Sequence, residues 1–268
     1  MTYLYLPRIR IQAANAHATS WVINAAPMMA LNMFGHNLGR KLEAFPSGVA
    51  VIHHDAQLLG ESEGKGFYGR LRPQQRRGAS FIDKNDYSSK NPHALSLQPT
   101  ASCHLTVSLV LSFEDPFDVE EVEEFLSTAR IAGGQVISWG EPAVFHEEAE
   151  LRRSLRSGYW IIERRDLLEG QKNPLETIIQ TIGHKAEPAP EGALPNTWIV
   201  PTVLGYATIT DFQDRSGARE GYPHAFCESL VGLVQYVLVR KYGSQTLPFW
   251  QYQWLNDEVF VIQQKKGN

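Results

Sequence analysis

The chain has 268 residues, 43% of them hydrophobic, which is enough for one large or two modest domains with a sizeable core. No apolar run is long enough to span a membrane, and the short apolar start is followed rather than preceded by arginines, so we expect neither a membrane segment nor a signal peptide. The two cysteines, Cys103 and Cys227, match no metal-ligand spacing, which predicts a cytoplasmic protein without a metal or another cofactor. With a net charge of −4, a nucleic-acid binder would have to concentrate its basic residues locally.

Residues 3–21 predict a strand that runs into a polar loop. The two-residue period of a strand gives one apolar face and one face that ends in hydrogen-bond donors: Tyr3, Tyr5, Pro7, Ile9 and Ile11 against Leu4, Leu6, Arg8, Arg10 and Gln12. The loop then carries Asn15, His17 and Trp21. Guanidinium, amide, imidazole and indole groups in this order suit a phosphate backbone with unpaired bases. The alternative is an ordinary first strand with solvated arginines.

The next segments predict a helix at 26–44 and a strand at 48–57. Apolar side chains recur at helical spacing in the first segment, and Arg40 and Lys41 suit the negative end of its dipole. His53, His54 and Asp55 in the strand resemble metal ligands. Neighbouring strand residues point to opposite faces, however, so we do not predict a metal site there.

Residues 64–95 predict an inserted hairpin or loop with a basic first part. Within 64–82 the basic side chains occur without an intervening acid, interleaved with glycines and aromatic residues: Lys65, Arg70, Arg72, Arg76 and Arg77. Arginine neutralises phosphates and aromatic rings stack on bases, so this segment favours contact with RNA or DNA. A solvated loop that is basic by chance is the alternative.

Residues 103–113 predict a third strand whose polar face carries His104, Thr106 and Ser108. An acid-rich helix follows at 118–129, with Asp118 as its predicted N-cap, and should face away from nucleic acid. Residues 130–140 predict a glycine turn and a fourth strand. The resulting order, strand, helix, strand, strand, helix, strand, is the ferredoxin-like order that RNA-recognition modules share with many unrelated proteins.

The rest of the chain predicts a smaller α+β domain, which gives an α+β protein with domains at 1–142 and 143–268. We expect helices at 145–157 and 174–183, strands at 159–163 and 197–210, and a linker or exposed loop at 186–195. Residues 223–242 predict the longest amphipathic helix. The alternating Trp250, Tyr252 and Trp254 favour a domain interface over base stacking.

Several segments together carry a family resemblance: LPRIRIQAANA, HLTVSLVLSF, RIAGGQVI, WIVPTVLGY and PHAFCESLVGLVQYVL. In this order they resemble the CRISPR-associated RAMP-superfamily subunit that caps the 5′ handle of the crRNA in type I-F surveillance complexes (the Csy complex of the Cascade group). The resemblance implies a non-catalytic, crRNA-binding subunit with an RRM-like N-terminal domain. It also implies that the chain contacts the large subunit and the first backbone subunit, and reaches target double-stranded DNA through the complex.

The resemblance points to specific RNA-binding residues. It places Arg8, Arg10, Asn15 and His17 in the opening strand and loop, and it likens the turn of Arg130, Gly133, Gly134 and Gln135 to the glycine-rich loop of the family. The basic hairpin stands where family members insert a thumb-like segment. Phosphate contacts from arginine would set register, and amide and imidazole groups would read base edges.

Three alternatives remain open at this point. A RAMP-superfamily endoribonuclease would use His17, His53, His54 or His104 as acid or base, although none is paired at a suitable spacing. A variant subunit of the same family could itself read the PAM on duplex DNA. A generic ferredoxin-like interaction protein would show no RNA affinity and no steep salt dependence.

Overall fold

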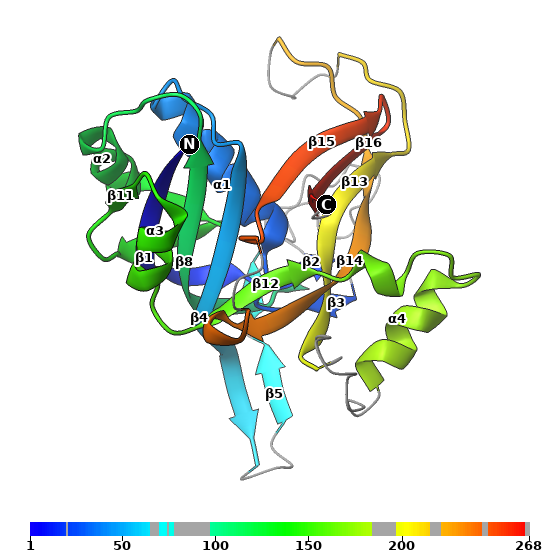
Figure 1. Ribbon diagram of the computed structural model, residues 1–268. Coiled ribbons are helices and arrows are strands. Elements are labelled where there is room, and N and C mark those ends of the chain that lie inside the picture. The colour runs from blue at the N-terminus through cyan, green and yellow to red at the C-terminus, as the bar shows by residue number, and fades with distance from the viewer. Residues whose placement is uncertain are drawn as a thin grey trace.

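The computed structural model describes residues 1–19, 21–64, 70–73, 75–77, 97–183, 197–214, 221–242 and 246–265. It is an α+β protein with one large, mainly antiparallel sheet (Figure 1). The strands are β1 (Thr2–Asn15), β2 (His17–Thr19), β3 (Val22–Ile23), β4 (Gly48–Glu63), β5 (Arg70–Pro73), β6 (Gln75–Arg77), β7 (Leu97–Pro99), β8 (Ser102–Phe113), β9 (Arg130–Ile131), β10 (Gly134–Ser138), β11 (Ala143–Phe145), β12 (Tyr159–Glu163), β13 (Ile199–Thr208), β14 (Cys227–Leu238), β15 (Trp250–Asn256) and β16 (Val259–Gln264). The α-helices are α1 (Met28–Lys41), α2 (Glu120–Thr128), α3 (Glu148–Ser154) and α4 (Pro174–Gly183). Most of the proposed insertion, residues 65–69, 74 and 78–96, and the proposed loop 186–195 lie outside the described residues.

The first half of the chain forms the strand order β4, β8, β1, β10, with every neighbouring pair antiparallel. Both α1 and α2 cover one face, where Leu31 and Phe34 of α1 and Leu126 of α2 join the main core. The opposite face is covered near the start of β1 by a second core that includes Leu151 of α3 and Trp160 of β12. Farther along β1 this second face carries polar side chains. The predicted helices at 26–44, 118–129 and 174–183 and the strands at 48–57, 103–113 and 159–163 are confirmed.

The predicted faces of β1 are wrong beyond Leu6. Leu4 and Leu6 share the main core with Ile9 and Ile11, whereas Tyr3 and Tyr5 lie in the second core, on the other face. The strand pairing with β8 shifts register between Leu6 and Ile9, where Arg8 has a positive φ of 48°. An extra residue in one strand reverses the alternation of side chains beyond it, and simple two-residue periodicity does not anticipate it.

The predicted helix at 223–242 is also wrong, because most of this segment is strand β14. It pairs on one side with β12 and on the other with β13. The consecutive residues Leu233, Val234 and Gln235 are all buried, as expected for a strand covered on both faces. Such a continuous apolar run contains residues at helical spacing by chance, and its many valines favour the extended conformation.

Strands of the second predicted domain pair with one edge of strand β4, which belongs to the first. Its residues His53 and Ile52 pair with Tyr159 and Trp160 of β12, and Val49 pairs with Trp250 of β15. The buried Trp250 donates its ring N–H to the carbonyl of Ile161, 2.9 Å away. The sheet therefore continues across the proposed boundary at 142, and the division into two domains stays a prediction.

Within the described ranges, no helix is both long enough and apolar enough to cross a membrane. The same part of the chain holds no group of three or more His, Cys, Asp or Glu side chains placed to bind a metal ion.

Histidine 53 occupies an apolar position next to this shared edge. Its ring meets Tyr236 edge-on, with the ring centroids 5.0 Å apart, and its buried Nε2 has no hydrogen-bond partner within the described part of the chain. Burial, together with the neighbouring His54, lowers the pKa of His53 to about 4, and the charge of Asp55 opposes this shift. Between pH 6.5 and 4 the unfolded chain therefore binds a proton here that the folded chain does not.

We expect the free energy of unfolding to fall as the pH drops below 6.5, with His53 contributing roughly 2 kcal/mol of the loss between pH 7 and 5. A His53→Phe variant keeps a ring against Tyr236 and removes the proton-binding group, so its stability should depend less on pH over this range. Urea unfolding of both proteins at pH 7, 6 and 5 measures the difference. Equal losses in the two proteins would contradict the assignment.

Candidate nucleic-acid interface

Two bulges meet at one buried hydroxyl in the middle of the sheet. Strand β8 lies between β1 and β4, and each outer strand shifts register beside Val107, with Arg8 as the extra residue on β1 and His54 on β4. The backbone N–H of Arg8 donates to Ser108 Oγ over 2.9 Å, and Ser108 Oγ lies 2.6 Å from His54 Nε2. Ser108 is fully buried, so its hydroxyl joins both bulges away from water.

The hydrogen-bond partners of His54 show which atom donates and which accepts in each contact. His54 Nδ1 lies 2.9 Å from the carbonyl oxygen of Ser157, which can only accept, so Nδ1 carries the proton and Nε2 accepts from the Ser108 hydroxyl. Burial lowers the pKa of His54, the hydrogen bond to Ser157 opposes this shift, and the charge of Arg8 adds to it. A Cβ on Gly158 would lie 2.8 Å from His54 Nδ1, so only glycine allows this approach. The imidazole is therefore held neutral in one tautomer.

This arrangement exposes a short row of polar side chains in an open groove of about 460 Å³. Across the three strands, Arg10 pairs with Thr106 and Thr106 pairs with Asp55. Among the described residues, neither exposed arginine, Arg8 or Arg10, has a carboxylate partner within salt-bridge distance. Two uncommitted guanidiniums beside a hydroxyl form a site suited to a phosphate, while Asp55 reduces the net positive charge.

Strand β1 has a second bulge near its end, at Ala13. Ala13 has a positive φ of 55°, and its N–H donates to His104 Nδ1 over 3.3 Å. Beyond it the glycine turn approaches closely, because a Cβ on Gly134 would lie 2.6 Å from the backbone nitrogen of Ala14. The N–H of Asn15 donates to the carbonyl of Ala132 over 2.8 Å. The predicted loop and the predicted glycine turn are therefore neighbours.

The side chains around this turn are only partly available to a ligand. Asn15 closes a local turn, since its Oδ1 accepts from the backbone N–H of His17 and its Nδ2 donates to the His17 carbonyl. Arg130 donates to the carbonyl of Gly133 over 3.4 Å, and Gln135 donates to that of Ala129 over 3.4 Å. Trp21, between β2 and β3, is 59% exposed. The turn therefore offers an arginine and an exposed positive-φ glycine, Gly133.

The basic hairpin differs from its sequence pattern in one respect. Strand β5 pairs with the outer end of β4, below the rest of the sheet (Figure 1), and sets Arg70 opposite Glu63 and Arg72 opposite Glu61. Arg72 also forms an exposed salt bridge with Glu63, 2.8 Å apart. Acids that are absent between the arginines in sequence are thus present across the strands. For Arg76 and Arg77 only the backbone is described, paired with Gln98 and Leu97 of β7.

The groove contains residues that the sequence did not single out as a site. The sequence does place Thr106 and Ser108 on the polar face of the strand 103–113, and this polar face is the pattern from which the groove could have been predicted. The sequence presents His54 and Asp55 as possible metal ligands, and His54 also as a possible acid or base of a ribonuclease. The contribution of Ser157 and Gly158 depends on the pairing of β12 with β4, which no local pattern reveals.

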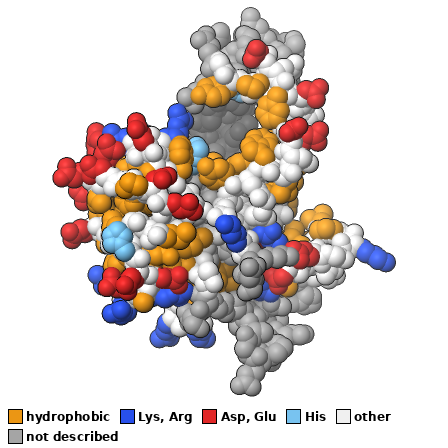
Figure 2. All heavy atoms as spheres, turned by 45° about the horizontal axis from the view of Figure 1, so that its top comes forward, with side chains coloured by type: hydrophobic (Ala, Val, Ile, Leu, Met, Phe, Trp, Pro, Cys, Tyr) orange, Lys and Arg blue, Asp and Glu red, His pale blue; other side chains and the backbone are white. Residues whose placement is uncertain are grey.

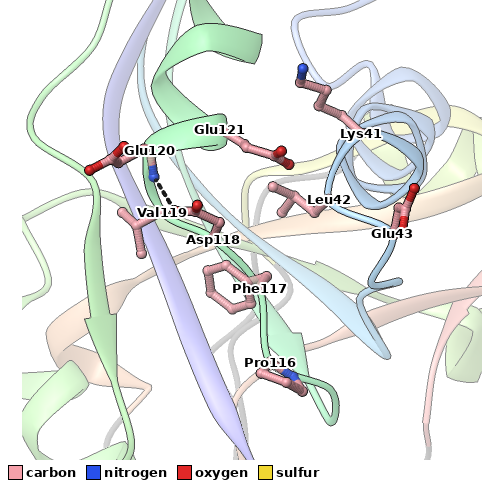
Figure 3. A pocket seen from close by; sticks show the side chains of 9 residues that line it. All are labelled: Lys41, Leu42, Glu43, Pro116, Phe117, Asp118, Val119, Glu120 and Glu121. Atoms are coloured by element: carbon pink, nitrogen blue, oxygen red, sulfur yellow. Dashed lines mark hydrogen bonds between the residues drawn. The ribbon is translucent and has the colours of Figure 1, made fainter.

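The opposite side of the molecule is acidic and contains a larger pocket, of about 800 Å³ (Figure 3). It lies between the end of α1 and the start of α2. The N-cap of α2 is Val119 and not the predicted Asp118, although Asp118 accepts a hydrogen bond from the N–H of Glu120 over 2.9 Å. Lys41 forms an exposed salt bridge with Glu124, 2.9 Å apart. Figure 2 shows acidic side chains gathered on this side. A phosphate backbone would be repelled here, so the larger pocket is a poorer nucleic-acid site than the groove.

Replacing Ser108 by alanine should leave both the Arg8 N–H and His54 Nε2 without a partner. We expect a loss of about 1–3 kcal/mol in the free energy of unfolding, and faster hydrogen exchange at the Arg8 amide. Ser112→Ala is the matched control on the same strand, because Ser47 Oγ also donates to the Ser112 carbonyl and keeps that bond. Equal exchange rates at Arg8 in both variants would show that the hydroxyl does not hold the bulge.

Comparison with known proteins gives the chain its family. The family model for CRISPR-associated protein (Cas_Csy2) matches residues 4–261, nearly the whole chain. A comparison with curated proteins finds no match. The match includes every candidate residue described above, and it agrees with the resemblance carried by the sequence segments. The chain therefore belongs to the CRISPR-associated Cas_Csy2 family, whose members are subunits of the type I-F Csy complex.

Proposed function

We propose that this chain binds and caps the 5′ handle of the crRNA in a type I-F surveillance complex, without cutting it. In this proposal Arg8 and Arg10 bind phosphates, and the residues at the end of β1 and in the glycine turn contact unpaired bases. The chain also docks the large subunit and the first backbone subunit, and it reaches target DNA through them. The single observation that carries the RNA-binding role is the groove in which two guanidiniums, without a carboxylate partner among the described residues, stand beside Thr106.

The position of the groove supports the proposal. Its side chains lie on the sheet face opposite α1 and α2, and the acid-rich α2 is on the far side. RNA-recognition modules bind RNA on the sheet face that their helices leave open. The elements β1, α1, β4, β8, α2 and β10 follow one another in the ferredoxin-like order, and this supports an RRM-type interpretation of residues 1–142.

A ribonuclease role has less support. His54 and Ser108 are within hydrogen-bond distance, as in a nucleophile and base pair, but Ser108 is fully buried and cannot reach a substrate. Both nitrogens of His54 are engaged, and its lowered pKa keeps the ring neutral. A residue in this state holds a backbone in place rather than transferring protons to and from RNA.

The Arg8→Gln/Arg10→Gln variant should bind crRNA more weakly by at least roughly tenfold, because two phosphate contacts are lost. The slope of log affinity against log salt should become shallower by about 1 to 2. Fluorescence anisotropy with labelled crRNA from the same locus, at several salt concentrations, measures both quantities. Arg153→Gln/Lys172→Gln is the control with the same change in net charge, made at exposed positions outside the groove.

An unchanged affinity and slope in the Arg8/Arg10 variant would remove the groove from the RNA site. Specific cleavage of precursor crRNA in the absence of metal, by the unmodified chain, would contradict the non-catalytic role.

Asp55→Asn should have the opposite effect. The carboxylate faces the groove from β4, on the other side of Thr106 from Arg10, and its removal raises the local positive potential. We expect crRNA affinity to rise about twofold to fivefold at low salt, with a smaller gain at high salt, where the charge is screened. The same anisotropy assay measures it, and a lower affinity in this variant would mean that Asp55 contacts the RNA directly.

A further inference from the structure

A continuous row of aromatic rings lies on the surface away from the groove. Each ring contacts the next, with centroids 5.1, 5.3, 6.0, 5.3 and 6.2 Å apart along the row. We call this row the aromatic strip; in order it consists of Phe45, His36, Tyr252, Phe260, Trp254 and Phe212. His36 Nδ1 and the Tyr252 hydroxyl lie 2.9 Å apart and join the middle of α1 to β15.

The strip is built on one face of the second half of the sheet. Trp254 of β15 pairs with Phe260 of β16, and Phe260 pairs with Tyr206 of β13, so the three rings project from the same face. Trp250, at the start of β15, is buried against β4, which fits a role in joining the two halves. Tyr252 and Trp254 follow it outward onto the surface.

Much of the strip faces solvent. Trp254 is 56% exposed, Phe45 49% and Phe212 46%. Figure 2 shows hydrophobic side chains along this upper part of the molecule, with acidic side chains beside them. Contiguous aromatic surface of this kind is uncommon on a monomer and marks an interaction site, because water solvates the ring faces poorly.

The charges around the strip distinguish a protein partner from a nucleic acid. Four exposed acids stand near its Trp254 end: Asp211, Asp214, Asp257 and Glu258. The segments 197–214 and 246–264 contain no Lys or Arg, while Arg215 and Arg219 lie outside the described residues. A phosphate backbone stacked on Trp254 would meet these carboxylates. At the other end Arg40 follows His36 by one helical turn.

We propose that the aromatic strip docks another protein subunit, whose contact surface carries apolar side chains flanked by Lys or Arg that meet the acidic end. The proposal rests on the assembly role given above and assigns that role a surface. It does not depend on where the RNA binds, since the groove lies on other strands.

The test is co-expression of the full chain, affinity-tagged, with crRNA and the subunits encoded by neighbouring genes. In a Trp254→Ser/Phe212→Ser variant we expect recovery of at least one protein subunit to fall roughly tenfold or more, even after ribonuclease treatment. Trp198→Ser is the control, because Trp198 is 73% exposed and lies outside the strip. Asp257→Lys/Glu258→Lys should also reduce recovery, and more strongly at low salt than at high salt.

Equal recovery with the strip variant and the Trp198 control would overturn the proposal. So would a loss of crRNA without a loss of protein partner, since the strip would then bind RNA. A dimer of the isolated chain that the strip variant breaks, with partner recovery unchanged, would make a second copy the occupant and would also overturn it. Failure of the RNA proposal appears separately, as unchanged crRNA affinity in the Arg8/Arg10 variant.

Discussion

The arrangement of the groove depends on the hydroxyl of Ser108. A β-bulge leaves an extra residue without its ladder partner, and two bulges on either side of one strand would leave a buried gap in the hydrogen bonding. Ser108 accepts from the Arg8 amide and donates to His54, so one side chain satisfies both. Because Arg8 sits at a positive φ, the bulge also turns its side chain to the open face, next to Arg10. Packing, backbone strain and the proposed phosphate site are therefore linked at a single atom.

A second hydrogen bond of this kind occurs five residues farther along β1, where the N–H of Ala13 donates to His104. The polar side chains of Ser108 and His104 in β8 thus serve as partners for the irregular backbone of β1. This gives a physical reason for the composition of β8, which alternates buried apolar and polar residues in its first half. Each bulge reorients β1 without ending it. The same strand therefore carries the two arginines and, farther along, lies next to the glycine turn.

Much of the fold could be predicted from the sequence, and the failures have clear causes. Helices α1, α2 and α4 and most strands follow from periodicity, because each obeys a local pattern. The predicted face of Ile9 was wrong because a bulge changes the period of side chains within a strand. The predicted helix over 227–238 was wrong because burial on both faces removes the two-residue period of a strand. In the site, Arg8 and Arg10 were recognisable as charged residues on a strand, whereas Ser157, Gly158 and the acids opposite Arg70 and Arg72 come from pairings between distant segments.

The shared edge of β4 has a consequence for how the chain acquires its structure. Residues 48–53 pair with β12 and β15, which begin at Tyr159 and Trp250, so this edge of β4 is complete only after β15 has been synthesised. During synthesis this edge stays unpaired, and an open strand edge invites pairing with other chains. Contacts so distant along the sequence also slow folding. Nascent chains should therefore be prone to aggregate until β15 has been synthesised, and a chaperone or an early-arriving assembly partner would benefit them most before that point.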